Sequence, residues 1–160
     1  MQINLLPNIR QSGKFSVIGI NEYFAMVRDG AYLAPIQAYQ NSTALSKDQR
    51  AELKIQIPAV TISGIFKDSV KNANLLTHSG LICIDFDAVE NVGQLKSELA
   101  KDPYTFATLL SASGNGLAAI VKIEPEKHLD AFTGLKAYYF KNYGQLIDES
   151  CKNVSRLRFL

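Results

Sequence analysis

Apolar residues in the second half of the chain follow a regular pattern that predicts six elements. Short apolar runs predict strands at residues 81–87, 104–111, 117–123 and 154–160. An apolar spacing of three to four predicts helices at residues 91–100 and from Pro125 to about Tyr143. This order, β-α-β-β-α-β, is that of a ferredoxin-like or RRM-like fold. We therefore expect an α+β palm over about residues 80–160, with helices on one face of its sheet and the other face open.

The pattern of residues 1–79 is less regular and predicts a smaller α/β subdomain packed on the palm as part of the same module. Ser46 and Gln49 have the spacing of a capping box, which predicts a short helix over residues 47–54. The remaining expected elements are extended stretches at 2–9 and 15–20, a helix at 21–27, and a strand after Pro58 interrupted at Gly64.

Composition narrows the class of protein without identifying it. A length of 160 residues suits one domain with a core, and 47% hydrophobic and 20% charged residues exclude wholesale disorder. A net charge of +2 is too small to indicate nucleic-acid binding by itself. The sequence has neither a long apolar segment nor a signal-peptide pattern, so we expect a cytoplasmic protein. The final residues read as a strand with no turn after it, so we expect a fragment of a longer chain.

Two aspartates end the first strand of the predicted palm, in the run LICIDFD. Asp85 and Asp87 are two residues apart and thus share one face of the strand. Carboxylates at the end of a buried strand need neutralisation, and Mg²⁺ or Mn²⁺ completed by waters and substrate phosphates is a common partner. The alternative is an aspartate that caps the helix beginning near Asn91, beside a solvated neighbour.

Further polar residues are expected near this pair. Asp148 precedes the last strand and would reach the aspartates if its loop folds over; it is equally suited to a turn or cap. Arg156 and Arg158 alternate along that strand, a spacing that suits phosphate groups but also an ordinary solvated face.

The hairpin turn SASGNG is a candidate phosphate cradle, because small residues let backbone N–H groups approach an anion. Its residues Ser111, Ser113, Gly114 and Gly116, together with Lys122, are the candidate phosphate contacts; an ordinary turn and a solvating lysine are the alternatives. Neither the histidines nor the cysteines have metal-site spacing. We expect His128 to be exposed on its helix and both cysteines to be reduced.

Three segments together resemble a known family: HSGLICIDFDAVEN, DPYTFATLLSASGNGLAAIVKI and YGQLIDESCKNVSRLRFL. They are similar to the archaeo-eukaryotic primase superfamily, and closest to the primase-polymerase-like domains described as VirE N-terminal domains of bacterial mobile-element proteins. The resemblance, which AVTISGIF supports, covers about residues 58–160 well and the first 57 weakly.

The resemblance implies roles for the same residues. Asp85 and Asp87 match the acids that hold catalytic Mg²⁺ or Mn²⁺, and Asp148 is the candidate third acid. The serine–glycine turn matches a small-residue turn near the phosphates of an incoming nucleoside triphosphate, and Arg156 matches the Ser-Arg step typical of the subgroup. Ala118 departs from the family, because many members have His or Lys there.

The expected function is therefore metal-dependent nucleotidyl transfer in replication of mobile elements or plasmids. Its implied partners are a nucleoside triphosphate, a single-stranded DNA template and a helicase or ATPase domain farther along the full-length chain. The alternative, motivated by Ala118, is a catalytically degenerate module of the same fold that binds nucleic acid or a protein partner. An RRM is disfavoured because residues 81–87 offer acids instead of stacking aromatics on that face.

Overall fold

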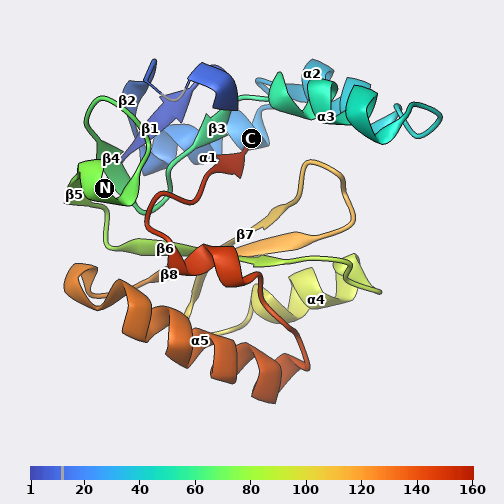
Figure 1. Ribbon diagram of the computed structural model, residues 1–160. Helices are drawn as coiled ribbons and strands as arrows, with labels where there is room; N and C mark the ends of the chain where they lie inside the picture. The colour runs from blue at the N-terminus through green and yellow to red at the C-terminus, as the bar shows by residue number, and fades with distance from the viewer. Residues whose placement is uncertain (12) are drawn as a thin grey trace.

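The computed structural model describes residues 1–11 and 13–160, and it has an α+β fold (Figure 1). The palm sheet is antiparallel with the strand order β6-β8-β7. Its strands are β6 (Leu81–Phe86), β7 (Thr105–Leu110) and β8 (Leu117–Lys122). The expected first, second and third strands of the palm are thus confirmed in position and in order. Asp85 lies opposite Ala118 in the register between β6 and β8.

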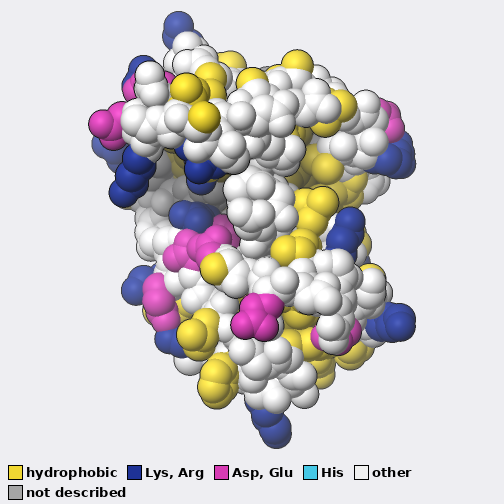
Figure 2. Space-filling model, turned by 90° about the vertical axis from the view of Figure 1, so that its right-hand side faces the viewer, with side chains coloured by type: hydrophobic (Ala, Val, Ile, Leu, Met, Phe, Trp, Pro, Cys, Tyr) yellow, Lys and Arg dark blue, Asp and Glu magenta, His cyan; other side chains and the backbone are white. Residues whose placement is uncertain are grey.

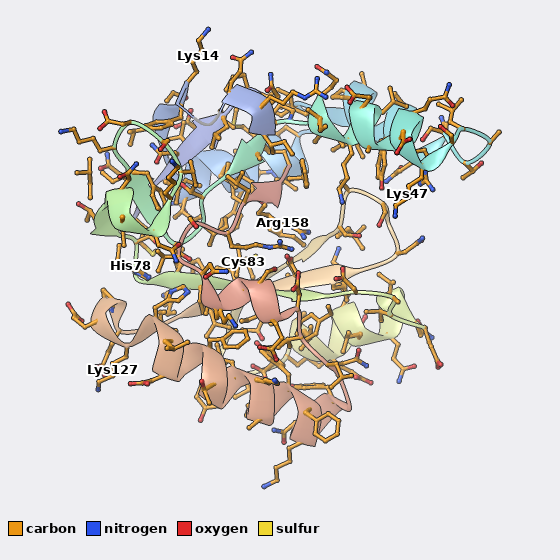
Figure 3. All side chains as sticks on the ribbon, viewed as in Figure 1. Lys14, Lys47, His78, Cys83, Lys127 and Arg158 are labelled. Carbon is orange, nitrogen blue, oxygen red and sulfur yellow. The ribbon has the colours of Figure 1, made fainter. Side chains whose placement is uncertain are left out.

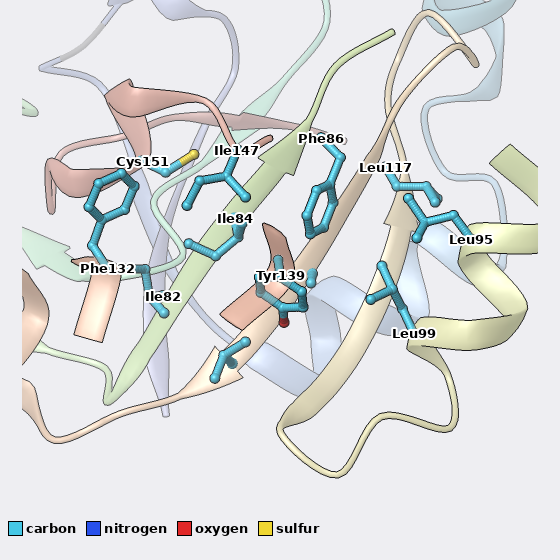
Figure 4. Packing of buried hydrophobic residues seen from close by; sticks show 12 residues of the cluster. Ile82, Ile84, Phe86, Leu95, Leu99, Leu117, Phe132, Tyr139, Ile147 and Cys151 are labelled. Carbon is cyan, nitrogen blue, oxygen red and sulfur yellow. The ribbon is translucent and has the colours of Figure 1, made fainter. Parts of the chain in front are cut away.

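Two helices cover one face of the palm sheet, as the sequence predicts. They are α4 (Val92–Leu99) and α5 (His128–Tyr143), which follows the 3-10 helix η3 (Pro125–Lys127). Asn91 caps α4 by accepting from the Gln94 amide, and Gly144 ends α5 with a left-handed φ of 65°. Figure 4 shows the core between them, where Phe86 packs edge-on against Tyr139. This core buries the face of β6 that carries Ile82, Ile84 and Phe86.

The first half of the chain forms a second α/β layer above the palm (Figure 1). A four-stranded sheet has the order β2-β1-β3-β9. It is accompanied by helices, by the hairpin β4–β5 and by two 3-10 helices. The bounds are β1 (Gln2–Leu6), η1 (Ile9–Gln11), β2 (Ser16–Gly19), α1 (Ile20–Arg28), α2 (Leu33–Gln40), α3 (Lys47–Ile55), β3 (Ala59–Val60), β4 (Gly64–Phe66), η2 (Asn72–Asn74) and β5 (Leu75–His78). The capping box at Ser46 and Gln49 is confirmed.

The last predicted strand is wrong in both extent and partner. Only β9 (Arg158–Phe159) is extended and paired, and it pairs with β3 of the other sheet instead of joining the palm. The segment before it runs along β6 as coil and the 3-10 helix η4 (Glu149–Lys152), and the Asp148 amide donates to the Asp85 carbonyl at 3.0 Å. The chain thus crosses from the palm to the upper layer between residues 152 and 158.

The expected open face of the palm sheet is also largely covered. Leu81 and Cys83 of β6 and Ile120 of β8 pack against the upper layer, including Ile3 and Tyr23. These side chains are apolar, so leaving them in water would cost free energy that burial under the first half avoids. Asp87, directly after the end of β6, stays exposed. None of the described helices combines the length and apolar character needed to cross a membrane.

Candidate functional site

A hollow of about 450 Å³ lies between the two layers, at the end of β6. Figure 2 shows it as a recess with acidic side chains at its lower edge and basic side chains above. Four parts of the chain supply its polar residues: α3, the end of β6, the β7–β8 turn, and the segment from η4 to β9. The polar and charged lining residues are Lys54, Asp85, Asp87, Ser111, Ser113, Ser150, Asn153, Ser155, Arg156 and Arg158.

Asp85 is buried, with 7% of its surface exposed, and arginines neutralise it. Arg158 Nη1 donates to Asp85 Oδ1 at 2.9 Å, and Arg156 Nη2 donates to Oδ2 at 3.0 Å. Arg158 is equally buried, and its Nη2 also donates to the Leu110 carbonyl at 2.6 Å. Figure 3 shows it between the two layers. The predicted arginine pair therefore converges on the predicted aspartate, although only Arg158 lies in a strand.

Asp148 joins this network through Arg156. Arg156 Nη2 donates to Asp148 Oδ2 at 2.8 Å, so one guanidinium bridges two carboxylates. Asp148 is also the N-cap of η4, because its Oδ1 accepts from the Ser150 amide at 2.8 Å. Burial raises the pKa of Asp148, but the Ser150 hydrogen bonds and Arg156 outweigh it and leave that pKa below its usual value. The segment therefore folds toward Asp85, which is the condition for Asp148 to lie near it, and Asp148 also serves as the cap.

Asp87 lies at the rim of the same hollow but in a different setting, because its side chain is exposed. The alternative in which an aspartate caps the next helix is not seen, since Asn91 is that cap. Ser111 and Ser113 line the hollow, and their hydroxyl oxygens are 3.0 Å apart.

The glycines of the β7–β8 turn are required by the backbone geometry of the turn. Gly114 has a φ of 78°, and a Cβ at Gly116 would lie 2.6 Å from the Phe86 carbonyl oxygen. The expected cradle of backbone N–H groups is largely occupied, because the amides of Gly114, Asn115 and Gly116 donate within the turn. Phosphate contacts from this turn would therefore come from serine hydroxyls.

The prediction that Lys122 is a phosphate contact of this site is wrong. It pairs with Leu81 at the opposite end of β6 from Asp87, and its Nζ lies 4.4 Å from the centre of the Phe106 ring. Antiparallel pairing explains the error: because β8 runs opposite to β6, residues of β8 farther from the turn lie farther from the aspartates at the end of β6. Ala118, the departure from the family pattern, is fully buried under the upper layer, so its side chain does not face the hollow.

The two histidines, for which no partner was expected, lie together away from the hollow's lining. His78 Nε2 and His128 Nδ1 are 2.9 Å apart, and His128 is buried instead of exposed. Both cysteines are free, and both are buried.

A group of possible metal ligands includes Asp85, Asp148 and Cys151, whose ligand atoms all lie within 4.8 Å of one another. The carboxylate oxygens fit a hard cation such as Mg²⁺ or Mn²⁺. The sulfur does not, because burial raises the pKa of Cys151 to about 12, and its Sγ already accepts from the Asp85 amide. A cation at the carboxylates would have to share them with Arg156 and Arg158, which already contact them.

Lys54 is the charged lining residue that the sequence interpretation missed, beside the polar residues Ser150, Asn153 and Ser155. It comes from α3 in the first half of the chain, and its Nζ lies 5.1 Å from the centre of the Phe159 ring. The available signal was the spacing of Lys47, Arg50 and Lys54, which places three cations on one side of a capped helix.

A protein-family model described as BT4734-like, N-terminal domain, matches residues 52–160. The chain belongs to this family. The matched range contains every residue that lines the hollow except Ile9. No curated protein and no solved structure matches the chain.

Proposed function

We propose that this chain is a nucleotidyl-transfer domain of the primase-polymerase type, which binds a nucleoside triphosphate in the hollow beside a single-stranded DNA template. One observation carries the proposal: Asp85 and Asp87 meet Arg156 and Arg158 at one hollow between the two layers, and Arg156 also contacts Asp148. Its volume of about 450 Å³ is typical of small-molecule sites. The sequence resemblance described above supplies the reaction class.

The cations of the hollow are suited to a triphosphate, and the two arginines would act differently. Arg158 is buried and held by Asp85 and the Leu110 carbonyl, so it is committed to these two partners. Arg156 keeps 35% of its side chain exposed. It can exchange a carboxylate for a phosphate oxygen, a bidentate interaction that suits guanidinium groups. Lys54, on the opposite side of the hollow, and the Ser111 hydroxyl would contact the remaining phosphates.

The acids would hold the metal that this chemistry requires. Asp85, Asp87 and Asp148 provide hard oxygen ligands for Mg²⁺ or Mn²⁺, which when bound polarises the α-phosphate and lowers the pKa of an attacking hydroxyl. Movement of Arg156 onto a phosphate would release one oxygen each of Asp85 and Asp148 at the moment the substrate binds.

The test replaces Asp87 by asparagine, because this exposed carboxylate can lose its charge without leaving a buried cation unpaired. Template-directed extension of a labelled primer, with Mg²⁺ or Mn²⁺, should fall at least about 100-fold in Asp87→Asn. Asp130→Asn, the same change at an exposed position of α5, is the matched control and should keep full activity. Full activity in Asp87→Asn would contradict the assigned site.

A second candidate is a degenerate module that binds nucleic acid without catalysis. The observation that favours it is that both oxygens of Asp85 already accept hydrogen bonds from arginines, which neutralise it without a metal. In that case the parent protein would bind single strands but incorporate no nucleotide, and Mn²⁺ would leave its melting temperature unchanged. The nucleotidyl-transfer proposal instead requires that the parent protein incorporate nucleotides and that Mn²⁺ change its melting temperature.

A further inference from the structure

Helix α3 carries its positive charges on one side. Lys47, Arg50 and Lys54 follow one another at spacings of three and four, which places them on one face over about 10 Å of helix. Glu52 points to the other side, where Arg10 donates to it at 2.5 Å. The basic face of α3, as we call these three residues, is therefore separated from the acidic residues of its own helix.

Aromatic rings, not carboxylates, lie beside two of the three side chains of this face, Arg50 and Lys54. The Arg50 guanidinium lies 5.2 Å and the Lys54 ammonium 6.0 Å from the centre of the Tyr39 ring, and Lys54 also lies over Phe159. Within the described part of the chain, none of the three cations has a carboxylate oxygen within 4.0 Å. A ring orders a cation without cancelling its charge, so the face keeps its attraction for anions.

The basic face is continuous with the candidate site. A second hollow of about 340 Å³ runs along it and shares Lys54 with the first; its lining residues are Tyr39, Leu45, Lys47, Arg50, Ala51 and Lys54. Gln40 donates to the Ala112 carbonyl at 3.1 Å, which fastens the α2–α3 unit to the β7–β8 turn. Figure 3 places Lys47 on the side of α3 near that turn. An anionic chain leaving the first hollow could thus follow α3 without interruption.

We propose that the basic face of α3 binds the phosphate backbone of a single-stranded nucleic acid and leads the strand to the hollow. The inference rests on the proposed function for the identity of the strand. A row of unpaired cations interleaved with aromatic rings is the pattern by which proteins bind single strands without reading sequence. Arg50 supplies the planar donor that phosphate favours.

The experiment measures strand affinity in the absence of metal and nucleotide. Fluorescence anisotropy of a labelled oligodeoxythymidylate of about 16 nucleotides, in EDTA, is recorded over a series of salt concentrations. In the double variant Lys47→Gln, Arg50→Gln binding should weaken. The slope of log affinity against log salt should fall by about 1.4, at about 0.7 for each lost phosphate contact.

Two variants control for charge and for folding. Lys96→Gln, Lys141→Gln removes the same charge from exposed positions of α4 and α5 and should keep the parent slope. Arg50→Lys keeps the charge at one position of the face and should also keep the parent slope. Melting temperatures equal to that of the parent establish that each variant is folded.

Three results would overturn the inference: an unchanged slope in Lys47→Gln, Arg50→Gln; an equal fall in the Lys96, Lys141 control; or binding of polyglutamate as tight as that of the oligonucleotide. Failure of the proposed function looks different, because strand binding would show the expected change in slope while the parent incorporates no nucleotide. Nucleotide incorporation with an unchanged slope would reject the strand path alone.

Discussion

Asp85 and Arg158 are each almost fully enclosed, and each is the main charge partner of the other. Taking both charges out of water is costly, and their attraction roughly offsets that cost only while the pair stays intact. Arg156 differs, because it is part-exposed and also has Asp148 as a partner. At the scale of single residues, one arginine therefore maintains the fold and the other is free to serve a ligand.

We expect Asp85→Ala to lower the free energy of unfolding by about 3–5 kcal/mol, because it leaves the Arg158 guanidinium buried without its carboxylate. Asp87→Ala, at the exposed neighbour, should stay within about 0.5 kcal/mol of the parent. Urea unfolding followed by circular dichroism measures both. The double variant Asp85→Leu, Arg158→Met should recover much of the loss, whereas additive losses from the two single variants would show that the pair is not coupled.

At the scale of elements, the contact between His78 at the end of β5 and His128 at the start of α5 joins the two layers. The Gly80 amide donates to His78 Nδ1 at 3.0 Å, so the ring proton of His78 sits on Nε2 and is donated to His128 Nδ1. Protonation of either ring would place two donors against each other. Burial lowers the pKa of both histidines; the neighbouring ring lowers that of His128 further, while Glu126 raises that of His78.

The folded protein therefore binds protons at these rings less readily than the unfolded chain does, in which histidine titrates near pH 6.5. Their contribution to stability is complete above about pH 6.5 and is lost as the pH falls through the lowered pKa values. We expect the melting temperature to drop between pH 7.5 and 5.5. The drop should be smaller in the double variant His78→Asn, His128→Leu, which has neither titrating ring. An equal drop in the parent and in this variant would assign the effect to other groups.

Element by element, local patterns were sufficient where an element is defined by its own residues. The capping box of α3 and the end of α5 near Tyr143 are both predicted correctly from sequence, whereas the cap of α4 is Asn91 and not an aspartate. The errors concern pairing between distant segments. Nothing in the run VSRLRFL reveals that β9 will pair with β3 about 100 residues earlier, because strand propensity does not name a partner.

The candidate site could likewise be predicted from the sequence only in part. Asp85 and Asp87 stand out because acids follow an apolar strand, and the serine turn stands out by its small residues. Lys54 and the burial of Asp85 follow only from how the upper layer docks on the palm. The sequence therefore indicated which residues gather at the candidate site, but not which carboxylate the arginines would neutralise.

At the scale of the whole molecule, the two layers share a hydrophobic cluster, and the end of the chain connects them. The upper sheet contains β9 from the end of the chain, and the core beneath it contains Leu81 and Ile120 of the palm. Residues 1–79 and 80–160 are therefore described better as two halves of one folding unit than as separable domains. The family match, which begins at residue 52, likewise includes the β3–β9 pair.

This arrangement predicts that residues 80–160 alone will not form a stable palm. Without the first half, apolar side chains of β6 and β8 that are now fully buried would face water, and β9 would have no strand to pair with. The fragment should bind the dye ANS and melt without a cooperative transition, whereas the full chain should unfold in one step by both calorimetry and circular dichroism. Addition of the separate fragment 1–79 should restore part of the cooperative signal, because it supplies the missing face and the β3 edge. A cooperative transition in 80–160 alone would mean that the helical face of the sheet suffices for folding, and that the upper layer is an attachment whose contacts serve the site instead of the fold.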